Sequence, residues 1–145
     1  MRKVLWPCSV FLAVCLLSVP TLAHHPFSAM FDSLRAGTIR GVVTKITWTM
    51  PHPYIYLDVR DERGQTANWF VEGSNVRILE NAGWSAATVK PGDTISVCGY
   101  LGKPNVSPEG YPPGVVSERA LSGVLVTLSD GRNLPLISMD RMSCP

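Results

Sequence analysis

The sequence has few charged residues and no cluster of basic ones, which limits the partners that it can bind. Asp, Glu, Lys and Arg make up 17% of the 145 residues. Two basic residues, Arg2 and Lys3, lie in a segment that we expect to be removed, and without them eleven basic residues balance eleven acidic ones. Nucleic acids and anionic membranes both select for concentrated positive charge. We therefore expect neither as a partner.

The sequence also lacks the short motifs of common enzyme classes. It has no internal repeat, no Gly-rich phosphate loop and no Gly-x-Ser-x-Gly element. No nucleophile with a neighbouring base and no pair of carboxylates can be read from the expected strands. This pattern favours a binding protein over an enzyme, although a copper oxygenase is compatible with the residues.

Long hydrophobic runs are missing except at the start of the chain, where the order of residues is typical of a signal peptide. A basic start precedes an apolar run from Val4 to Val19, and residues 20–23 (Pro-Thr-Leu-Ala) form a small-residue cleavage site. An uncleaved membrane anchor is disfavoured, because the run is shorter than the ~20 residues that span a bilayer and contains Pro7. We expect cleavage after Ala23 and a periplasmic or secreted protein without stable membrane insertion.

Cysteine is scarce outside this leader. Cys8 and Cys15 lie within it, so the remaining chain keeps Cys98 and Cys144. In an oxidising compartment an even pair favours a disulfide, with two free thiols or metal ligation by cysteine as the alternatives. We predict a Cys98–Cys144 disulfide, because Cys98 lies on the polar face of its strand, where the C-terminal tail can cross it.

Alternating and β-branched segments predict a mostly β domain with one helix. The expected strands are Gly37 to Trp48, a second around Ile55, Leu57 and Val59, Gln65 to Glu72, Thr94 to Leu101, Arg119 to Leu128, and a short return from Arg132 to Ile137. Between the third and fourth strands, Ser74 can cap a helix that carries Val76, Leu79 and Ala82 on one face. Gly83 can end this helix in a left-handed conformation.

This order of elements is that of an OB-type barrel, in which a helix lies between strands three and four. We therefore expect a small, five- to six-stranded OB-like β-barrel domain over residues 37–145, preceded by an N-terminal segment over residues 24–36. An open α+β roll or half-sandwich is the closest alternative. The Pro- and Gly-rich stretch from Gly102 to Ser117 predicts an ordered loop with little regular structure.

Five short motifs, taken together, carry a resemblance to a known family. They are His24-His25-Pro26-Phe27-Ser28-Ala29-Met30-Phe31-Asp32, Trp48-Thr49-Met50-Pro51-His52, Gly83-Trp84, Lys90-Pro91-Gly92-Asp93 and Asp130-Gly131-Arg132. Their order and spacing resemble the DUF6152 family of small exported bacterial proteins. That family has serine and asparagine where this chain has Pro26 and Met50. The resemblance implies the fold and export but no reaction, since the family has no settled function.

The three histidines of the chain gather at two places, the expected mature terminus (His24 and His25) and the first hairpin turn (His52). After cleavage, His24 would carry a free α-amino group beside its imidazole, and these two nitrogens can chelate one ion. His52 would complete a T-shaped set of three nitrogens, which resembles the histidine brace of copper proteins. Nitrogen ligands of this kind favour Cu(II), with zinc next. The sequence therefore predicts a copper site.

Each of these candidate ligands also has a simpler interpretation. His52 lies between two prolines and can bond to the backbone of its own turn, and a His-His start can be a solvated tail. Met30 and Met50 can add thioether ligands for Cu(I), but methionine more often fills a core. Glu72 can be a ligand, a partner of a ligand, or a solvated or salt-bridged acid.

A second hypothesis needs no metal. Tyr54 and Tyr56 alternate with the apolar residues of their strand and are candidates for a ligand-binding face. The protein would then be a binding or assembly module that uses the barrel face and the Pro/Gly loop for a small ligand or a periplasmic protein partner. The metal hypothesis instead describes a protein that carries or buffers copper through His24 and His52. Metal content after purification distinguishes the two.

Overall fold

The structure is a computed structural model of the chain and describes residues 26–106, 113–137 and 143–144. This part of the chain is mostly β, with six strands in one sheet, two short α-helices and one 3-10 turn. In chain order the elements are α2 (Phe27–Met30), β1 (Phe31–Thr47), β2 (Tyr54–Arg60), β3 (Thr66–Glu72), α3 (Val76–Asn81), β4 (Thr94–Gly102), η1 (Ser117–Arg119), β5 (Ala120–Thr127) and β6 (Asn133–Pro135).

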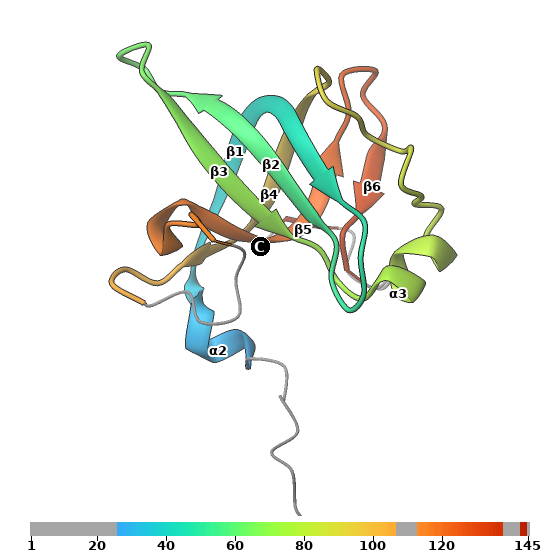
Figure 1. Cartoon of the computed structure of the whole chain (residues 1–145), viewed down its shortest axis with the longest axis horizontal. Helices are drawn as coiled ribbons and strands as arrows, with labels where there is room; N and C mark the ends of the chain where they lie inside the picture. The colour runs from blue at the N-terminus through green and yellow to red at the C-terminus, as the bar shows by residue number, and fades with distance from the viewer. Residues whose placement is uncertain (1–25, 107–112, 138–142, 145) are drawn as a thin grey trace, which may run out of the picture.

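The strands pair in the order β3-β2-β1-β4-β5-β6, and each neighbouring pair is antiparallel. One further pairing is parallel and joins β3 to β5, with Phe70 opposite Ala120 and Glu72 opposite Ser122. The sheet therefore curls until β3 and β5 meet, as Figure 1 shows near the lower end of β3. This pairing places the end of β3 beside the start of β5.

The main hydrophobic core lies inside the curled sheet. It contains inward-facing residues of the strands, residues from α3 and the segment that follows it, and one residue after β6: Ile39, Val43, Ile55, Leu57, Val71, Leu79, Trp84, Val89, Ile95, Val97, Leu121, Val126 and Leu136. The indole Nε1 of Trp84 donates a buried hydrogen bond of 2.7 Å to the Pro135 carbonyl oxygen. This bond links the segment after α3 to β6.

A second, smaller core lies where α2 packs against the sheet. Met30, Phe31, Phe70 and Ala120 are its buried members, and partly buried aromatic residues including Tyr54 and Tyr100 pack around them. Residues from the start of the described chain are therefore fixed against β3 and β5. Figure 1 shows α2 below the sheet, where it leads directly into β1.

Two expectations about local structure were wrong. The first strand begins at Phe31 rather than Gly37, because Phe31 pairs with Gly102 and its ring is buried. A register shift between Phe31 and Ala36 interrupts the alternation there, so the sequence pattern does not reveal this extension. The helix cap is Asn75, whose side-chain oxygen accepts a 2.9 Å bond from the Arg77 amide.

Two expectations, the end of the helix and the disulfide, are confirmed. Gly83 follows α3 with a positive φ of 88°, the left-handed conformation predicted for the helix end. Cys98 and Cys144 form a disulfide with a Cα–Cα distance of 5.7 Å. Of the predicted Gly102–Ser117 loop, residues 107–112 lie outside the described residues. In the described part of the chain, no helix is both long and apolar enough to cross a membrane.

Candidate functional site

The turn between β1 and β2 is held against the end of β3 and the start of α3. Its Met50–Pro51 peptide bond is cis. The Pro51 carbonyl accepts a hydrogen bond from the Val76 amide at 3.2 Å, and the Pro53 carbonyl accepts one from the Gly73 amide at 3.0 Å. His52 lies between these two anchored prolines, so its backbone is fixed on both sides.

The ring of His52 is oriented by the backbone of Gly73. Its Nδ1 lies 3.0 Å from the Gly73 carbonyl oxygen. A carbonyl oxygen only accepts, so Nδ1 carries the proton and donates it. In the neutral ring the other nitrogen, Nε2, then carries the lone pair. His52 is thus presented in the tautomer that can bind a metal or accept a proton through Nε2.

Glu72 adds a buried carboxyl group beside this ring. Its residue is 8% exposed at the end of β3, and its Oε1 lies 3.9 Å from Nδ1 of His52. Burial raises the pKa of Glu72 to about 7, because the charged carboxylate loses hydration there. Tyr54 pairs with Glu72 across the two strands, and burial together with the Glu72 charge raises the pKa of Tyr54.

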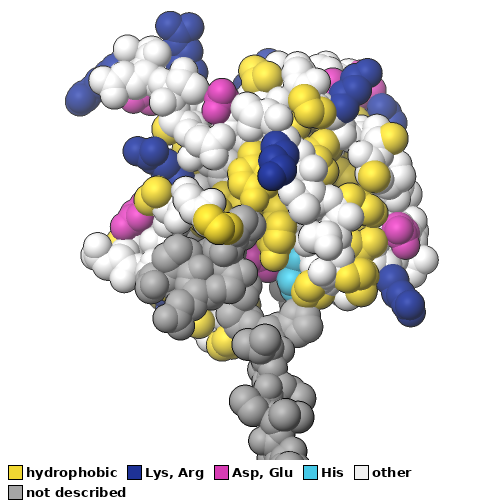
Figure 2. Space-filling model, viewed as in Figure 1, with side chains coloured by type: hydrophobic (Ala, Val, Ile, Leu, Met, Phe, Trp, Pro, Cys, Tyr) yellow, Lys and Arg dark blue, Asp and Glu magenta, His cyan; other side chains and the backbone are white. Residues whose placement is uncertain are grey.

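His52 and Glu72 line one cavity of about 210 Å³, which we name the polar cavity. Its other described lining residues come from α2, β1, β5 and the segments after β3 and β6: Phe27, Phe31, Gly73, Ser74, Ser122, Gly123 and Ile137. Figure 2 shows a histidine side chain next to an acidic one at the edge of a hydrophobic patch. The start of the described chain therefore reaches the cavity that holds His52.

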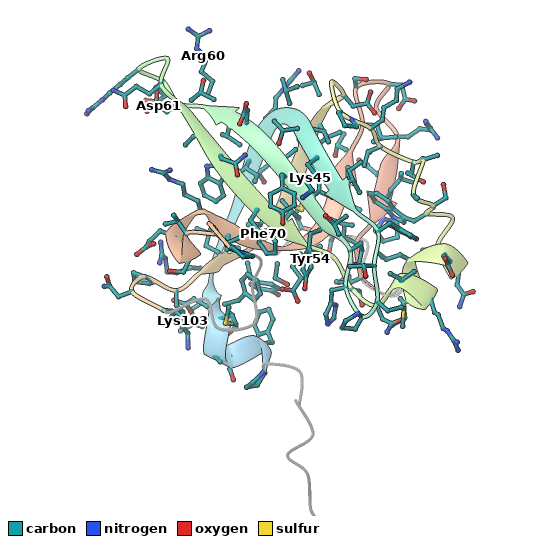
Figure 3. All side chains as sticks on the ribbon, in the orientation of Figure 1. Lys45, Tyr54, Arg60, Asp61, Phe70 and Lys103 are labelled. Carbon is teal, nitrogen blue, oxygen red and sulfur yellow. A yellow bond between two sulfur atoms is a disulfide. The ribbon has the colours of Figure 1, made fainter. Side chains whose placement is uncertain are left out.

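Several contacts fix α2 at this cavity. The Lys103 side chain donates a 2.6 Å hydrogen bond to the Ser28 carbonyl, and the Lys103 amide donates a 2.9 Å bond to the Met30 carbonyl. The ring of Phe27 meets that of Tyr100 edge-on, with centroids 5.6 Å apart. Figure 3 shows Lys103 beside α2. These contacts hold α2, and with it Phe27, at the edge of the cavity.

The remaining candidates from the sequence lie at separate places. His24 and His25 lie outside the described residues. Met30 is buried in the second core, whereas Met50 is 56% exposed in the β1–β2 turn. Among the residues that the structure describes, no three His, Cys, Asp or Glu side chains are grouped as a metal site. His52 and Glu72 are therefore the predicted candidates that the structure brings together.

The two tyrosines lie on the outer side of β2 and pack on one ring. The Tyr54 and Tyr56 rings lie 4.9 Å and 5.6 Å from that of Phe70. The Lys45 ammonium lies 5.4 Å from the centre of the Tyr56 ring. Figure 3 labels Lys45, Tyr54 and Phe70, which lie on the same face of the sheet. Both tyrosines are half-buried, so part of each ring faces solvent.

Sequence reasoning missed the parts of the site that depend on strand pairing. The Gly73 carbonyl that holds His52 belongs to the backbone and carries no sequence signal. A Cβ at Gly73 would lie 3.0 Å from Pro53 and 3.2 Å from Leu79, so a glycine fits there closely. The Gly73-Ser74 pair directly after a strand was the available hint of a close backbone approach.

Comparison with known families gives one match, over residues 12–108, to a family described as "Family of unknown function (DUF6152)". The chain belongs to the DUF6152 family. This result confirms the family that the sequence motifs indicated. The DUF6152 match contains His52 and Glu72, whereas Ser122 on β5 and Cys144 lie beyond it. No curated protein and no solved structure matches the chain.

Proposed function

We propose that this protein is an exported copper-binding protein that carries or buffers the ion through its mature N-terminus and His52. The observation that carries the proposal is the polar cavity, in which Phe27 of α2 lies beside His52 and Glu72. Phe27 follows the expected first residue, His24, by only three positions. The expected first residue is therefore separated by only a short length of chain from a residue that lines the cavity of His52.

Covalent geometry limits how far the two N-terminal histidines can lie from this cavity. A chain spans at most about 3.6 Å per residue, so the Cα of His25 lies within about 7 Å of the Phe27 Cα and that of His24 within about 11 Å. An imidazole extends several ångströms further. We propose that the amine and imidazole of His24 reach His52 at the polar cavity, provided that cleavage follows Ala23.

The hydrogen bond of His52 supports a role as a ligand. Histidines that bind metals usually donate their other ring N–H to a carbonyl or carboxylate, which fixes the tautomer and the ring orientation. The Nδ1 bond to the Gly73 carbonyl has this arrangement, and the metal would be bound through Nε2. Glu72 supplies an oxygen donor beside the same ring. Two imidazoles and an amine form a nitrogen-rich set, which favours Cu(II) over Zn(II).

Further observations support an OB-like fold and export of the protein. The additional β3–β5 pairing, with a helix between β3 and β4, supports the interpretation of the sheet as an OB-like barrel. The basic, apolar and small-residue order of residues 1–23 supports export. The Cys98–Cys144 disulfide is consistent with an oxidising compartment such as the periplasm.

A metal-free binding module is the second candidate. The observation that favours it is the half-exposed aromatic face of Tyr54 and Tyr56, which pack against Phe70. Such a face can hold a flat ligand or a protein partner without any metal. On this hypothesis, replacing both tyrosines by alanine would abolish binding of the partner, and the N-terminal histidines would be dispensable.

Electron paramagnetic resonance of the Cu(II)-loaded, signal-processed protein tests the proposal. Intact mass first verifies that the chain begins at His24. We expect one tightly held Cu(II) with hyperfine coupling from three nitrogens, and loss of one of these couplings in a His52→Ala protein. A Met50→Ala protein is the matched control, because Met50 lies in the same turn but is mostly exposed. A spectrum that is identical with and without His52 contradicts the proposal.

A further inference from the structure

A second cavity, of about 300 Å³, lies next to the polar cavity and has a different lining. We name it the apolar cavity, and its described lining residues are Phe27, Ser33, Tyr100, Ser122, Val124 and Ile137. Phe27, Ser122 and Ile137 also line the polar cavity. The two cavities therefore adjoin, and we refer to the pair as the cleft, with an apolar and a polar end.

The dimensions of the apolar cavity suit a molecule with a single ring. Its volume is at the lower end of the range for small-molecule sites, roughly 300–1,000 Å³. The rings of Phe27 and Tyr100 stand nearly perpendicular, with an interplanar angle of 87°. Aromatic rings pack favourably against such a pair, edge to face or offset.

The charges around the cleft decide which kind of ring fits best. Among the described residues that line the apolar cavity, none carries a charge. An anionic or a cationic group in this cavity would therefore lose hydration without an oppositely charged side chain among these residues to offset the loss. The Ser122 hydroxyl lines both cavities and can accept a bond from a ligand O–H group.

We infer that the apolar cavity binds a small neutral aromatic molecule of the phenol class, with the ring against Phe27 and Tyr100 and the hydroxyl toward Ser122. The inference stands on the lining of the cleft and does not require that a metal is bound at His52. If copper is bound there, the ligand lies beside it. The protein would then recognise a phenolic compound next to its metal site.

Titration of the metal-free, signal-processed protein with phenol, followed by ¹H–¹⁵N NMR, tests the inference. We expect saturable shifts of the amides of Phe27, Ser122 and Val124. Benzoate, which has the same ring but a negative charge, should bind about tenfold more weakly or not at all. Benzylamine provides the corresponding cationic probe and should also bind more weakly than phenol.

Two neighbouring substitutions on β1 form a matched pair. Ser33 is exposed at the rim of the apolar cavity, so Ser33→Trp should fill the cavity without disturbing the core and should weaken phenol binding at least about tenfold. Leu34 is 92% exposed and does not line the cavity, so Leu34→Trp should leave phenol binding unchanged. The amide spectra of the two variants show whether each is folded.

Several results would overturn the inference. These are the absence of saturable shifts with phenol, equal binding of benzoate, tighter binding of benzylamine, or full binding by the Ser33→Trp protein. Each of them leaves the copper proposal intact, because the titration contains no metal. Conversely, phenol binding by a protein that fails to bind copper would support the inference and contradict only the proposed function.

Discussion

Replacing Glu72 by glutamine is expected to change how the stability of the metal-free protein depends on pH. Burial raises the pKa of Glu72 from an ordinary value of 4.5 to about 7, so the folded protein holds the carboxyl proton more tightly than the unfolded chain does. The folded state is therefore favoured most below pH 4.5. This contribution is lost progressively as the pH rises toward 7 and is absent above it.

The magnitude follows from the difference between the two pKa values. Each tenfold change in proton affinity corresponds to about 1.4 kcal/mol, so the free energy of unfolding should fall by about 3 kcal/mol between pH 4.5 and pH 8 on account of Glu72 alone. Glutamine has the same shape and no titrating proton. The Glu72→Gln protein should therefore lack this decrease and should exceed the original protein in stability mainly at pH 8.

Urea denaturation at several pH values between 4.5 and 8, in the presence of a chelator, measures the effect. Glu62→Gln is the matched control, because Glu62 is exposed in the turn between β2 and β3 and should leave the pH dependence as it is. The reasoning is refuted if Glu72→Gln shows the same decrease in stability with pH as the original protein.

Three further substitutions test the packing of the fold by chemical denaturation. Replacing both Cys98 and Cys144 by serine opens a loop with a sequence separation of 46 and should lower the free energy of unfolding by roughly 3–4 kcal/mol; two thiols titrating in the unreduced, denatured original protein would contradict the bridge. Gly123→Ala should cost roughly 1–3 kcal/mol, because its Cβ would lie 2.5 Å from the nearest side-chain carbon; unchanged stability would show that the core accommodates it. Trp84→Phe removes the 2.7 Å bond to the Pro135 carbonyl and should cost about 1–3 kcal/mol, a loss that would be absent if water replaced the indole.

Sequence patterns predicted the strands well where one face of the strand is buried. Ile55 and Leu57 are buried and alternate with the half-buried Tyr54 and Tyr56, and this period of two is what defines a strand in the sequence. The helix was also predicted, since Val76 and Leu79 face the core at helical spacing. The cap was misplaced because serine and asparagine are both common caps, so the sequence did not distinguish Ser74 from Asn75. In the structure the Asn75 side chain forms the cap, and the Ser74 amide donates to the Leu136 carbonyl.

The candidate site was predicted only in part, because it depends on contacts between distant segments. The sequence singled out His52 and Glu72 separately, but their proximity follows from the antiparallel pairing of β2 with β3. The early start of β1 at Phe31 and the helix α2 were not predicted. They exist because Met30 and Phe31 bury their side chains against Phe70, a long-range contact that no local pattern announces.

The most direct test of the copper proposal is a calorimetric titration of Cu(II) into three signal-processed proteins. These are the original protein, His52→Ala, and a form with one additional residue before His24. Imidazole and amine nitrogens bind metal when deprotonated, so the titration is performed at pH 7.5 and repeated at pH 5.5, where affinity should be lower. We predict that each change weakens Cu(II) binding about tenfold or more, by removing one nitrogen or displacing the amine. Equal affinity in all three proteins would contradict a shared copper site at His24 and His52.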